Sequence, residues 1–592
     1  MTFSINLSNL DGSNGFRLDG APGDLSGVSI STAGDVNGDG FNDVIVGAVF
    51  ADPHGSKSGS SYVVFGKASG FSAAMNLSSL DGSNGFRLDG EEEFDRSGWS
   101  VSTAGDVNGD GFDDVIIGAA GAVSDYYSSD SPGFSYVVFG KASGFNATLD
   151  LSSLDGSNGF RLDGEKKYDF SGWSVSTAGD INGDGWDDVI VGTPQADSNA
   201  HDSGSSYVVF GKASGFSATM DLSNLDGNNG FQLDGRKELD HLGTSVSNAG
   251  DMNGDGYDDV IIGAPGYRQS YHGYGVYSTG FSYVVFGKAS GFDATLDLSS
   301  LDGSNGFRLD GERILDFSGG SISTAGDVNG DGFDDVIIGA SGADSNGINS
   351  GSSYVVFGKT SGFSATMNLS DLDGSNGFRL DGEADHRSGP VSTAGDVNGD
   401  GFDDVIIGAS GGFSHVVFGK ASGFSATINL SSLDSSEGFC LEREAGRYEG
   451  TVSTAGDVNG DGFDDLMIGD DRSGVDFSGS TYILFGRSHF DEIVDFPGTP
   501  GDDTLIGTRA GEVFDAGNGN DRMIGRGGAD TFHGGKGADY IRVPDLDFQL
   551  VDGGAGVDIL ALSRSGLNLD LTRVHGKIHA IGRMCAASSA SN

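Results

Sequence analysis

Short apolar runs separated by small polar residues recur along most of the chain. In the unit that spans residues 101–164 the runs are VSTAG (101–105), DVIIGA (114–119), SYVVFG (135–140) and GFRLDG (159–164). Gly, Asp, Ser and Asn punctuate these β-rich runs, and no long helical periodicity lies between them. Each unit therefore predicts four short β-strands.

The pattern returns seven times. The first Asp of the cassette STAGDVNGDGFDDVIIGA falls at Asp35, Asp106, Asp180, Asp251, Asp327, Asp396 and Asp457. A four-stranded unit leaves both of its faces uncovered, and stacking seven units around an axis buries those faces and leaves only short edges. We therefore expect an all-β fold with a seven-bladed β-propeller over residues 1–490. An open solenoid of seven units is the alternative.

The phase of the repeat indicates how the ring closes. The chain enters with a lone fourth-strand segment, Phe16 to Gly20, and the seventh unit stops after its third-strand segment, Tyr482 to Arg487. The strand missing at one end is present at the other. We expect the N-terminal strand to complete the last blade as a non-covalent clasp.

Each cassette also contains the spacing D-x-N-x-D-G-x-x-D, which is typical of an oxygen cage for a hard cation. Side chains at positions 1, 3, 5 and 9 and the carbonyl of position 7 are the expected calcium ligands, and Gly at position 6 permits a sharp turn. The predicted ligands are Asp35, Asn37, Asp39, Phe41 and Asp43; Asp106, Asn108, Asp110, Phe112 and Asp114; Asp180, Asn182, Asp184, Trp186 and Asp188; Asp251, Asn253, Asp255, Tyr257 and Asp259; Asp327, Asn329, Asp331, Phe333 and Asp335; Asp396, Asn398, Asp400, Phe402 and Asp404; and Asp457, Asn459, Asp461, Phe463 and Asp465.

Two other interpretations of these turns are weaker. A metal-free Asp/Asn/Gly turn has the same composition, but three carboxylates within nine residues repel one another unless a cation neutralises them. An EF-hand would need a bidentate Glu at position 12 and flanking helices. Magnesium fits less well than calcium because its strict octahedron usually retains several waters.

Composition narrows the possible partners. The 592 residues include 33 Lys+Arg and 86 Asp+Glu, a formal net charge of -53. Such a charge opposes binding to nucleic acid and to anionic lipid. Cys440 and Cys585 form neither a metal spacing nor a disulfide framework. The N-terminus has no cleavable signal pattern, and no apolar run of 18 or more residues occurs, so we expect no direct membrane insertion.

These cassettes resemble FG-GAP repeats, the blades of the integrin α-subunit propeller and of related bacterial and fungal proteins. Residues Ser171 to Pro194 (SGWSVSTAGDINGDGWDDVIVGTP) and Gly243 to Pro265 (GTSVSNAGDMNGDGYDDVIIGAP) carry the pattern best. The GAP triplet reads GAV, GAA, GAS or GDD in other units, and the opening FG is mostly SG. The resemblance implies a calcium-dependent binding or adhesion protein. We do not expect integrin signalling, because this sequence shows none of the additional integrin domains.

A second rhythm of nine residues follows Phe485. Acidic residues mark the same position of successive nonapeptides at Asp503, Glu512, Asp521, Asp530, Asp539 and Asp558. The segment resembles the repeats-in-toxin (RTX) nonapeptide family, whose turns wind a parallel β-roll around calcium. We expect a β-roll over residues 491–562, with Asp521, Asp530 and Asp539 as ligands, and a tail over 563–592. A disordered glycine linker is the alternative.

The RTX resemblance also implies a route of export. That family generally leaves bacteria by type I secretion with an uncleaved C-terminal signal, which would suit a secreted or cell-surface protein. The tail GKIHAIGRMCAASSASN has a Cys, several basic residues and no acidic residue, unlike the usual family ending.

The loops between the second and third strands vary most between units, and rigid scaffolds often present recognition on such loops. Tyr is a favoured contact residue there. The candidate ligand-binding residues are Tyr126, Tyr127, Tyr267, Tyr271, His272, Tyr274 and Tyr277. Neutral drift in solvated loops is the alternative. Trp99 and Trp173, in first strands, favour blade packing over sugar stacking.

The predicted function is therefore a calcium-binding extracellular or cell-surface adhesion protein that engages a protein ligand on a cell or matrix surface. A lectin-like propeller that binds glycans is the alternative. A calcium-dependent hydrolase is less favoured, because no H-E-x-x-H, P-loop or dinucleotide fingerprint appears. We predict no enzymatic activity.

Overall fold

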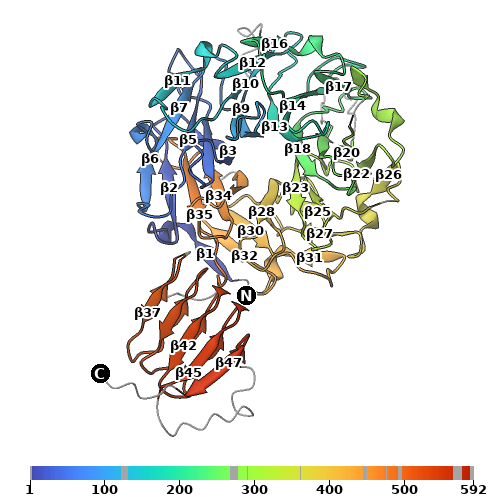
Figure 1. The fold of residues 1–592 in the computed structure, drawn as a ribbon. Helices are drawn as coiled ribbons and strands as arrows, with labels where there is room; N and C mark the ends of the chain where they lie inside the picture. The colour runs from blue at the N-terminus through green and yellow to red at the C-terminus, as the bar shows by residue number, and fades with distance from the viewer. Residues whose placement is uncertain are drawn as a thin grey trace. The chain divides into compact units, whose positions relative to one another are not determined.

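The computed structural model describes residues 3–121, 131–266, 278–289, 291–360, 362–443, 450–474, 476–490, 496–499, 501–563 and 577–586. The chain folds into two compact units, one made of most of Met1–Phe485 and the other mainly of Gly486 onward. In the larger unit seven sheets are arranged as the sectors of a ring (Figure 1). The structure confirms the all-β, seven-bladed propeller.

The two inner strands of each blade are the VSTAG and DVIIGA runs. The innermost strands are β3 (Ser26–Gly34), β8 (Ser100–Gly105), β13 (Ser174–Gly179), β18 (Ser245–Gly250), β23 (Ser321–Gly326), β28 (Val391–Gly395) and β33 (Val452–Gly456). The second strands are β4 (Asp43–Ala48), β9 (Asp114–Ala119), β14 (Asp188–Thr193), β19 (Asp259–Ala264), β24 (Asp335–Ala340), β29 (Asp404–Gly408) and β34 (Asp465–Asp470). The second strands are almost wholly buried, because neighbouring blades cover both of their faces.

The third and fourth strands are the SYVVFG and GFRLDG runs. The third strands are β5 (Ser60–Val64), β10 (Phe134–Val138), β15 (Ser205–Val209), β20 (Phe281–Val285), β25 (Ser352–Val356), β30 (Phe413–Val417) and β35 (Ser480–Leu484). The fourth strands are β2 (Gly15–Asp19), β7 (Gly85–Asp89), β12 (Gly159–Asp163), β17 (Gly230–Asp234), β22 (Gly306–Asp310), β27 (Gly377–Asp381) and β32 (Gly438–Glu442). Strands 1 to 4 of a blade pair antiparallel in this order.

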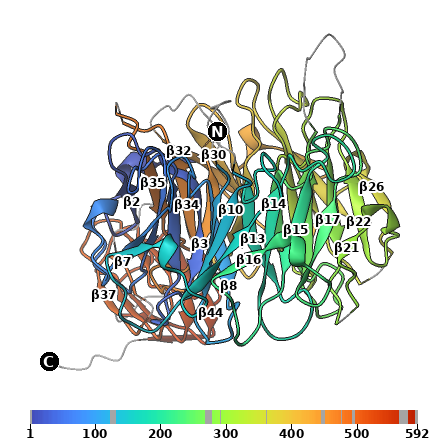
Figure 2. The same cartoon turned by 90° about the horizontal axis from the view of Figure 1, so that it is seen from above.

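Every blade also has a fifth strand, which the sequence pattern did not predict. It comes from a neighbouring repeat and pairs parallel with the fourth strand, as Leu162 does with Met220. The fifth strands are β1 (Ser4–Asn6), β6 (Ala74–Asn76), β11 (Thr148–Asp150), β16 (Thr219–Asp221), β21 (Thr295–Leu296), β26 (Thr366–Asn368) and β31 (Thr427–Asn429). Strands β13, β14, β15, β17 and β21 of one blade lie side by side in this order (Figure 2).

A 3-10 turn follows each fifth strand. The turns are Leu7–Asn9, Leu77–Ser79, Leu151–Ser153, Leu222–Asn224, Leu298–Ser300, Leu369–Asp371 and Leu430–Ser432. A stacked pair of phenylalanines anchors the connector that leads into the fifth strand: the rings of Phe86 and Phe145 lie 4.7 Å apart. The connector therefore packs against the blade before it, which places its short strand at that blade's edge.

The N-terminus closes the ring with two strands. Strand β2 pairs antiparallel with β35 of the last blade, with Phe16 opposite Ile483, which confirms the predicted clasp. Strand β1 pairs parallel with β32 of the sixth blade, with Ile5 opposite Leu441. The first 19 residues thus complete two different blades.

The hydrophobic core of the propeller consists of clusters between adjacent blades. One cluster joins Ile45 and Val63 of the first blade to Val115 and Ile117 of the second. The cluster at the closure combines Phe16 and Leu18 with residues of the first and last blades. Blades are therefore held by face-to-face packing as well as by their shared strands.

The smaller unit contains two five-stranded parallel sheets. One sheet has β36 (Phe496–Pro497), β38 (Val513–Asp515), β40 (Thr531–His533), β43 (Leu550–Asp552) and β46 (Ile578–His579), and the other has β37 (Thr504–Ile506), β39 (Arg522–Ile524), β42 (Tyr540–Val543), β45 (Ile559–Leu562) and β47 (Arg583–Ala586). A short pair joins β41 (Lys536–Gly537) to β44 (Ala555–Gly556). Apolar residues such as Phe514 and Phe532 fill the interior, as expected for a β-roll.

The β-roll continues past residue 562, where the sequence pattern placed its end. Strands β46 and β47 lie in the segment that we expected to be a tail, and each adds one strand to a sheet. Nonapeptide spacing could not reveal them because an insertion separates them from the last regular repeat. Within the described residues, no helix is long and apolar enough to cross a membrane.

Candidate calcium sites

The acidic turn between the first and second strands is ordered by its own carboxylates. In the first blade Asp35 accepts hydrogen bonds from the backbone N–H groups of Asp39 (3.0 Å) and Gly40 (2.9 Å), and Asp39 accepts one from Phe41 (3.1 Å). Gly40 has a φ of 89°, which favours glycine. Turns at Asp106, Asp180, Asp251 and Asp327 repeat the first pair of bonds.

The ninth residue of the turn is a fully buried carboxylate. Asp43 accepts hydrogen bonds from the backbone N–H groups of Val36 (3.1 Å) and Gly66 (2.9 Å), so it ties the turn to the end of the third strand. The equivalent residues have 0% exposure in every blade: Asp43, Asp114, Asp188, Asp259, Asp335, Asp404 and Asp465. A charge in such a place requires compensation.

No basic side chain provides that compensation in the five turns where the surroundings are described. The pKa of Asp43 is raised to about 8, chiefly by burial and also by the carboxylates of Asp39 and Asp35, while the N–H of Gly66 opposes the shift. Burial likewise raises the pKa of Asp114, Asp188 and Asp335 to about 9 and that of Asp259 to about 8. The charged groups that act on each of them are other carboxylates.

This arrangement fits a calcium ion. The donors are all oxygens, the local charge is negative and uncompensated, and calcium accepts six to eight oxygen ligands in an adaptable geometry. In none of the described turns do oxygen atoms of all three carboxylates lie within 4.8 Å of one another. Among the described residues, a group of three potential ligands this close together occurs at one place outside the turns. The Asn at position 3 and the carbonyl at position 7 would therefore complete the ligand set.

A residue that the sequence reasoning missed links each turn to the next blade. The eighth residue of the turn accepts a hydrogen bond from the backbone N–H of the first Asp in the preceding blade. These donor–acceptor pairs are Asp35–Asp113 (2.7 Å), Asp106–Asp187 (2.8 Å), Asp180–Asp258 (2.8 Å), Asp251–Asp334 (2.8 Å), Asp327–Asp403 (2.8 Å), Asp396–Asp464 (2.9 Å) and Asp457–Asn42 (3.1 Å). The eighth residue is the first Asp of the FDDVII motif, and this doubling of Asp is the feature of the sequence that could have indicated the link.

The aromatic residue at position 7 has a second role that the sequence did not reveal. Its ring packs on the glycine at position 4 of the preceding turn, so a Cβ on Gly38 would collide with Phe112, and one on Gly109 with Trp186. The same relationship joins Gly183 to Tyr257. Neighbouring turns are thus in direct contact around the ring.

The β-roll carries a ladder of carboxylates along one edge. The backbone N–H of Asp503 donates to Asp521 (2.7 Å), that of Asp521 to Asp539 (2.8 Å), and that of Asp539 to Asp558 (2.9 Å). Each acceptor uses Oδ1, whereas Oδ2 of Asp521, Asp539 and Asp558 is buried without a hydrogen-bond partner. Such orphaned oxygens fit a cation.

The opposite edge has a shorter version of this ladder. The backbone N–H of Glu512 donates to Asp530 over 3.2 Å. Burial raises the pKa of Asp521 and Asp530 to about 6 and that of Asp539 to about 7, and neighbouring carboxylates add to the shift. All three predicted roll ligands therefore lie in places where a cation would offset buried negative charge.

The predicted recognition residues Tyr126, Tyr127, Tyr267, Tyr271, His272, Tyr274 and Tyr277 lie outside the described residues. Trp99 and Trp173 belong to adjacent blades, and their ring centroids lie 5.0 Å apart. Phe170 packs edge-on against Trp173 at 6.4 Å. These contacts are in line with a packing role.

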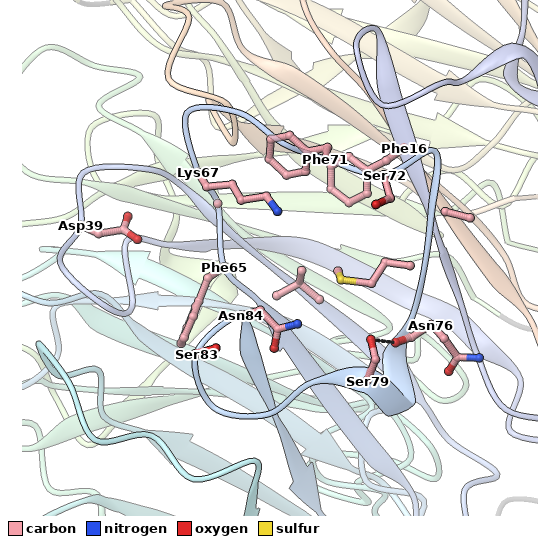
Figure 3. Close-up of a pocket in the computed structure, with 14 residues that line it drawn as sticks. Phe16, Asp39, Phe65, Lys67, Phe71, Ser72, Asn76, Ser79, Ser83 and Asn84 are labelled. Atoms are coloured by element: carbon pink, nitrogen blue, oxygen red, sulfur yellow. Dashed lines mark hydrogen bonds between the residues drawn. The ribbon is translucent and has the colours of Figure 1, made fainter.

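A pocket of about 530 Å³ lies near the first acidic turn (Figure 3). The stacked rings of Phe16 and Phe71, 4.7 Å apart, form part of its wall. Lys67, over the ring of Phe71, and Asn84 provide polar groups, and the predicted calcium ligand Asp39 lines the pocket. The pocket thus combines aromatic faces with hydrogen-bonding groups.

Known proteins resemble both parts of the chain. The FG-GAP repeat family matches residues 26–64, 97–138, 171–209, 242–285, 318–356 and 388–425. The RTX calcium-binding nonapeptide repeat matches residues 506–541. The seventh propeller turn, at Asp457, lies beyond the matched ranges, but Asp465 is buried there as in the other blades.

The curated relatives include integrin α subunits. Integrin alpha-5 of Xenopus laevis is 27% identical over 244 residues, 39% of this chain and 20% of that protein. Integrin alpha-V of Gallus gallus is 29% identical over 252 residues, covering 42% and 20%, and integrin alpha-PS3 of Drosophila melanogaster 32% over 191 residues, covering 31% and 14%. The match spans at most a fifth of the length of these three relatives. The chain is an FG-GAP repeat β-propeller protein that binds calcium and carries a C-terminal RTX nonapeptide segment.

Proposed function

We propose that the protein is a calcium-dependent adhesion protein that works outside the cell and uses its propeller to bind a protein ligand. The observation that carries this proposal is the ring of seven acidic turns, each with a fully buried carboxylate at its ninth position. In the five turns whose surroundings are described, the charged groups that act on this carboxylate are other carboxylates. The likeness to integrin α subunits supports a binding role rather than an enzymatic one. We propose no catalytic activity.

In this proposal each propeller turn holds one calcium ion through side chains at positions 1, 3, 5 and 9 and the carbonyl at position 7. The roll holds further ions through Asp521, Asp530 and Asp539. Calcium would fix the turns at one end of the strands, and the variable loops between second and third strands, with their tyrosines, would contact the ligand at the other end. The RTX segment supports export from a bacterial cell by type I secretion.

Binding to candidate surfaces tests this function. The full-length protein would be applied to immobilised matrix proteins and to whole cells, with calcium and with excess chelator. We expect calcium-dependent binding that is lost when Tyr271, Tyr274 and Tyr277 are replaced by Ser. The melting temperature of the tyrosine variant in excess calcium, compared with that of the wild type, is the control for a general loss of folding. Equal binding by the wild type and the tyrosine variant would contradict the assignment of the surface.

A glycan ligand is the second candidate, and the pocket of Figure 3 is the observation that favours it. Its residue types return in other units: Lys67 corresponds to Lys141 and Lys212, and Phe71 to Phe145 and Phe216. Repeated pockets suit a multivalent lectin. A glycan array separates the candidates, because substitution of Lys67 by Ala would reduce glycan binding at this pocket and leave binding through the tyrosine loops unchanged.

A further inference from the structure

One loop at the far end of the strands from the calcium turns brings an imidazole and two carboxylates together. In the third blade, between β14 and β15, ligand atoms of Asp197, His201 and Asp202 all lie within 4.8 Å of one another. Nδ1 of His201 lies 3.3 Å from Oδ1 of Asp197, and its Nε2 lies 3.5 Å from Oδ2 of Asp202. Among the described residues, this is the one group of three His, Cys, Asp or Glu side chains whose ligand atoms lie this close together.

A second histidine lies beside this group. The connection from β17 to β18 runs along the loop, so that the backbone N–H of Leu239 donates to His201 O (2.9 Å) and that of His241 to Asp202 O (3.2 Å). The second of these bonds places His241 directly beside Asp202. Two imidazoles and two carboxylates thus occupy one junction between a loop and the next blade.

Two other blades have the same backbone at this junction but different side chains. In the fifth blade the N–H groups of Asp385 and Arg387 donate to Ile348 O (2.9 Å) and Asn349 O (2.9 Å). Residue Asp344, like Asp197, accepts a hydrogen bond from the backbone five residues later (2.6 Å). The positions of His201, Asp202 and His241 are therefore occupied there by Ile348, Asn349 and Arg387.

The first blade repeats this scaffold with a third set of side chains. The N–H groups of Phe94 and Arg96 donate to Ser56 O (2.9 Å) and Lys57 O (3.0 Å). The equivalents of His201, Asp202 and His241 are Ser56, Lys57 and Arg96. The first and fifth blades place an arginine where the third blade has His241. Neither of these two blades combines an imidazole with two carboxylates at this junction. The ligand set is thus a property of these side chains and not of the fold.

We propose that Asp197, His201 and Asp202 bind a divalent transition-metal ion, of which Zn²⁺ is the biological candidate, and that His241 is its fourth ligand. Mixed imidazole and carboxylate donors suit Zn²⁺, whereas calcium prefers oxygen donors alone. The carboxylates add negative charge that favours a cation. The ion would fasten the 2–3 loop of the third blade to the connection that enters the fourth, at the end of the strands opposite the calcium turns.

Titration of the full-length protein in excess calcium tests the proposal, with Zn²⁺ followed by calorimetry and Co²⁺ by its visible absorption. We expect one equivalent of tight Zn²⁺ binding and a Co²⁺ spectrum of low coordination number. His201→Ala should weaken binding at least roughly tenfold, and His241→Ala by a similar factor. His54→Asn, at an exposed histidine of the first-blade scaffold, should leave binding unchanged.

The fifth blade provides a gain-of-function test. The triple variant Ile348→His, Asn349→Asp and Arg387→His should add a second equivalent of Zn²⁺, since the backbone there already has the required form. Absence of a second equivalent in a variant that melts normally in calcium would show that these side chains are insufficient. If the wild type bound Zn²⁺ no more tightly than His201→Ala, the group would be an ion pair with a protonated imidazole and the proposal would be wrong.

Discussion

The backbone N–H of Asp457 donates to the side-chain oxygen of Asn42 over 3.1 Å and so joins the last acidic turn to the first. At the six other junctions the acceptor is a carboxylate, at 2.7–2.9 Å. A neutral acceptor makes a weaker hydrogen bond than a charged one. The link that closes the ring is therefore the weakest of the seven.

Substitution of this acceptor should change the stability of the closure. Asn42→Asp is expected to stabilise the calcium-bound protein by about 1 kcal/mol, because the bond becomes charge-assisted. Asn42→Ala should cost about 1–3 kcal/mol, because the N–H of Asp457 loses its acceptor. Denaturant melts in excess calcium measure both changes. Asp113→Asn, which gives an internal junction the same neutral acceptor, is the matched control and should be destabilising.

The aromatic anchor of the clasp should matter more than the same anchor inside the ring. Phe16 and Phe86 are both buried and stack on Phe71 and Phe145 at 4.7 Å. Phe→Ala in a core costs roughly 3–5 kcal/mol. We expect Phe16→Ala to lower the melting temperature further than Phe86→Ala, because β2 is far in sequence from the rest of its blade. If the two variants lost equal amounts of melting temperature, and amide hydrogen exchange rose equally in β35 and β5, this prediction would be contradicted.

Removal of calcium should make stability strongly dependent on pH. In the metal-free protein the folded-state pKa of Asp43 is about 8 and that of Asp114 about 9, against 3.8 for an unperturbed Asp carboxyl. The folded state then holds protons that the unfolded state releases, so this stabilisation is complete below about pH 4 and is lost as the pH rises towards 8–9. We expect the chelated protein to melt at a lower temperature at pH 8 than at pH 5.

In calcium the protein should instead melt at a higher temperature at pH 8 than at pH 5, because a bound cation stabilises the ionised carboxylates and binds only the native state. Melting curves at both pH values, with calcium and with chelator, give the comparison. Indistinguishable curves in chelator and in calcium at pH 8 would rule out a stabilising role for the ion.

The roll should lose calcium when its carboxylate ladder is broken. Asp539→Asn removes the charge from a buried oxygen that has no hydrogen-bond partner, so calcium affinity in the roll should fall by roughly tenfold or more. Calorimetric titration of the full-length protein would show fewer tight equivalents. Asp547→Asn, at an exposed position outside the ladder, is the control and should leave the titration unchanged.

The near-identity of the repeats made most of the propeller predictable. The number of blades, their inner four strands and the clasp at Phe16 follow from counting cassettes and from their phase. The fifth strand did not follow, since a three-residue run such as Thr148–Asp150 has too little pattern, and its partner is another repeat. The link from Asp35 to Asp113 also escaped prediction, because spacing within a turn says nothing about the neighbouring turn.

The site on the third blade shows a different limit. Asp197, His201 and Asp202 were not singled out in the sequence, and the sequence could not show that a connection more than thirty residues later brings His241 beside them. The variable loops with the candidate tyrosines stay a sequence-based prediction. Contacts between repeats, rather than within them, were thus the part that only the structure supplied.

Because each sheet takes its outermost strand from the following repeat, the repeat in the sequence and the blade in space are out of phase. An in-register duplication or loss of one repeat preserves every strand pairing, since the new neighbour offers the same edge strand as the old one. A truncation within a repeat instead exposes an unpaired edge on the blade before it, and exposed edges promote aggregation. Such a chain can therefore lengthen or shorten by recombination only in whole repeats.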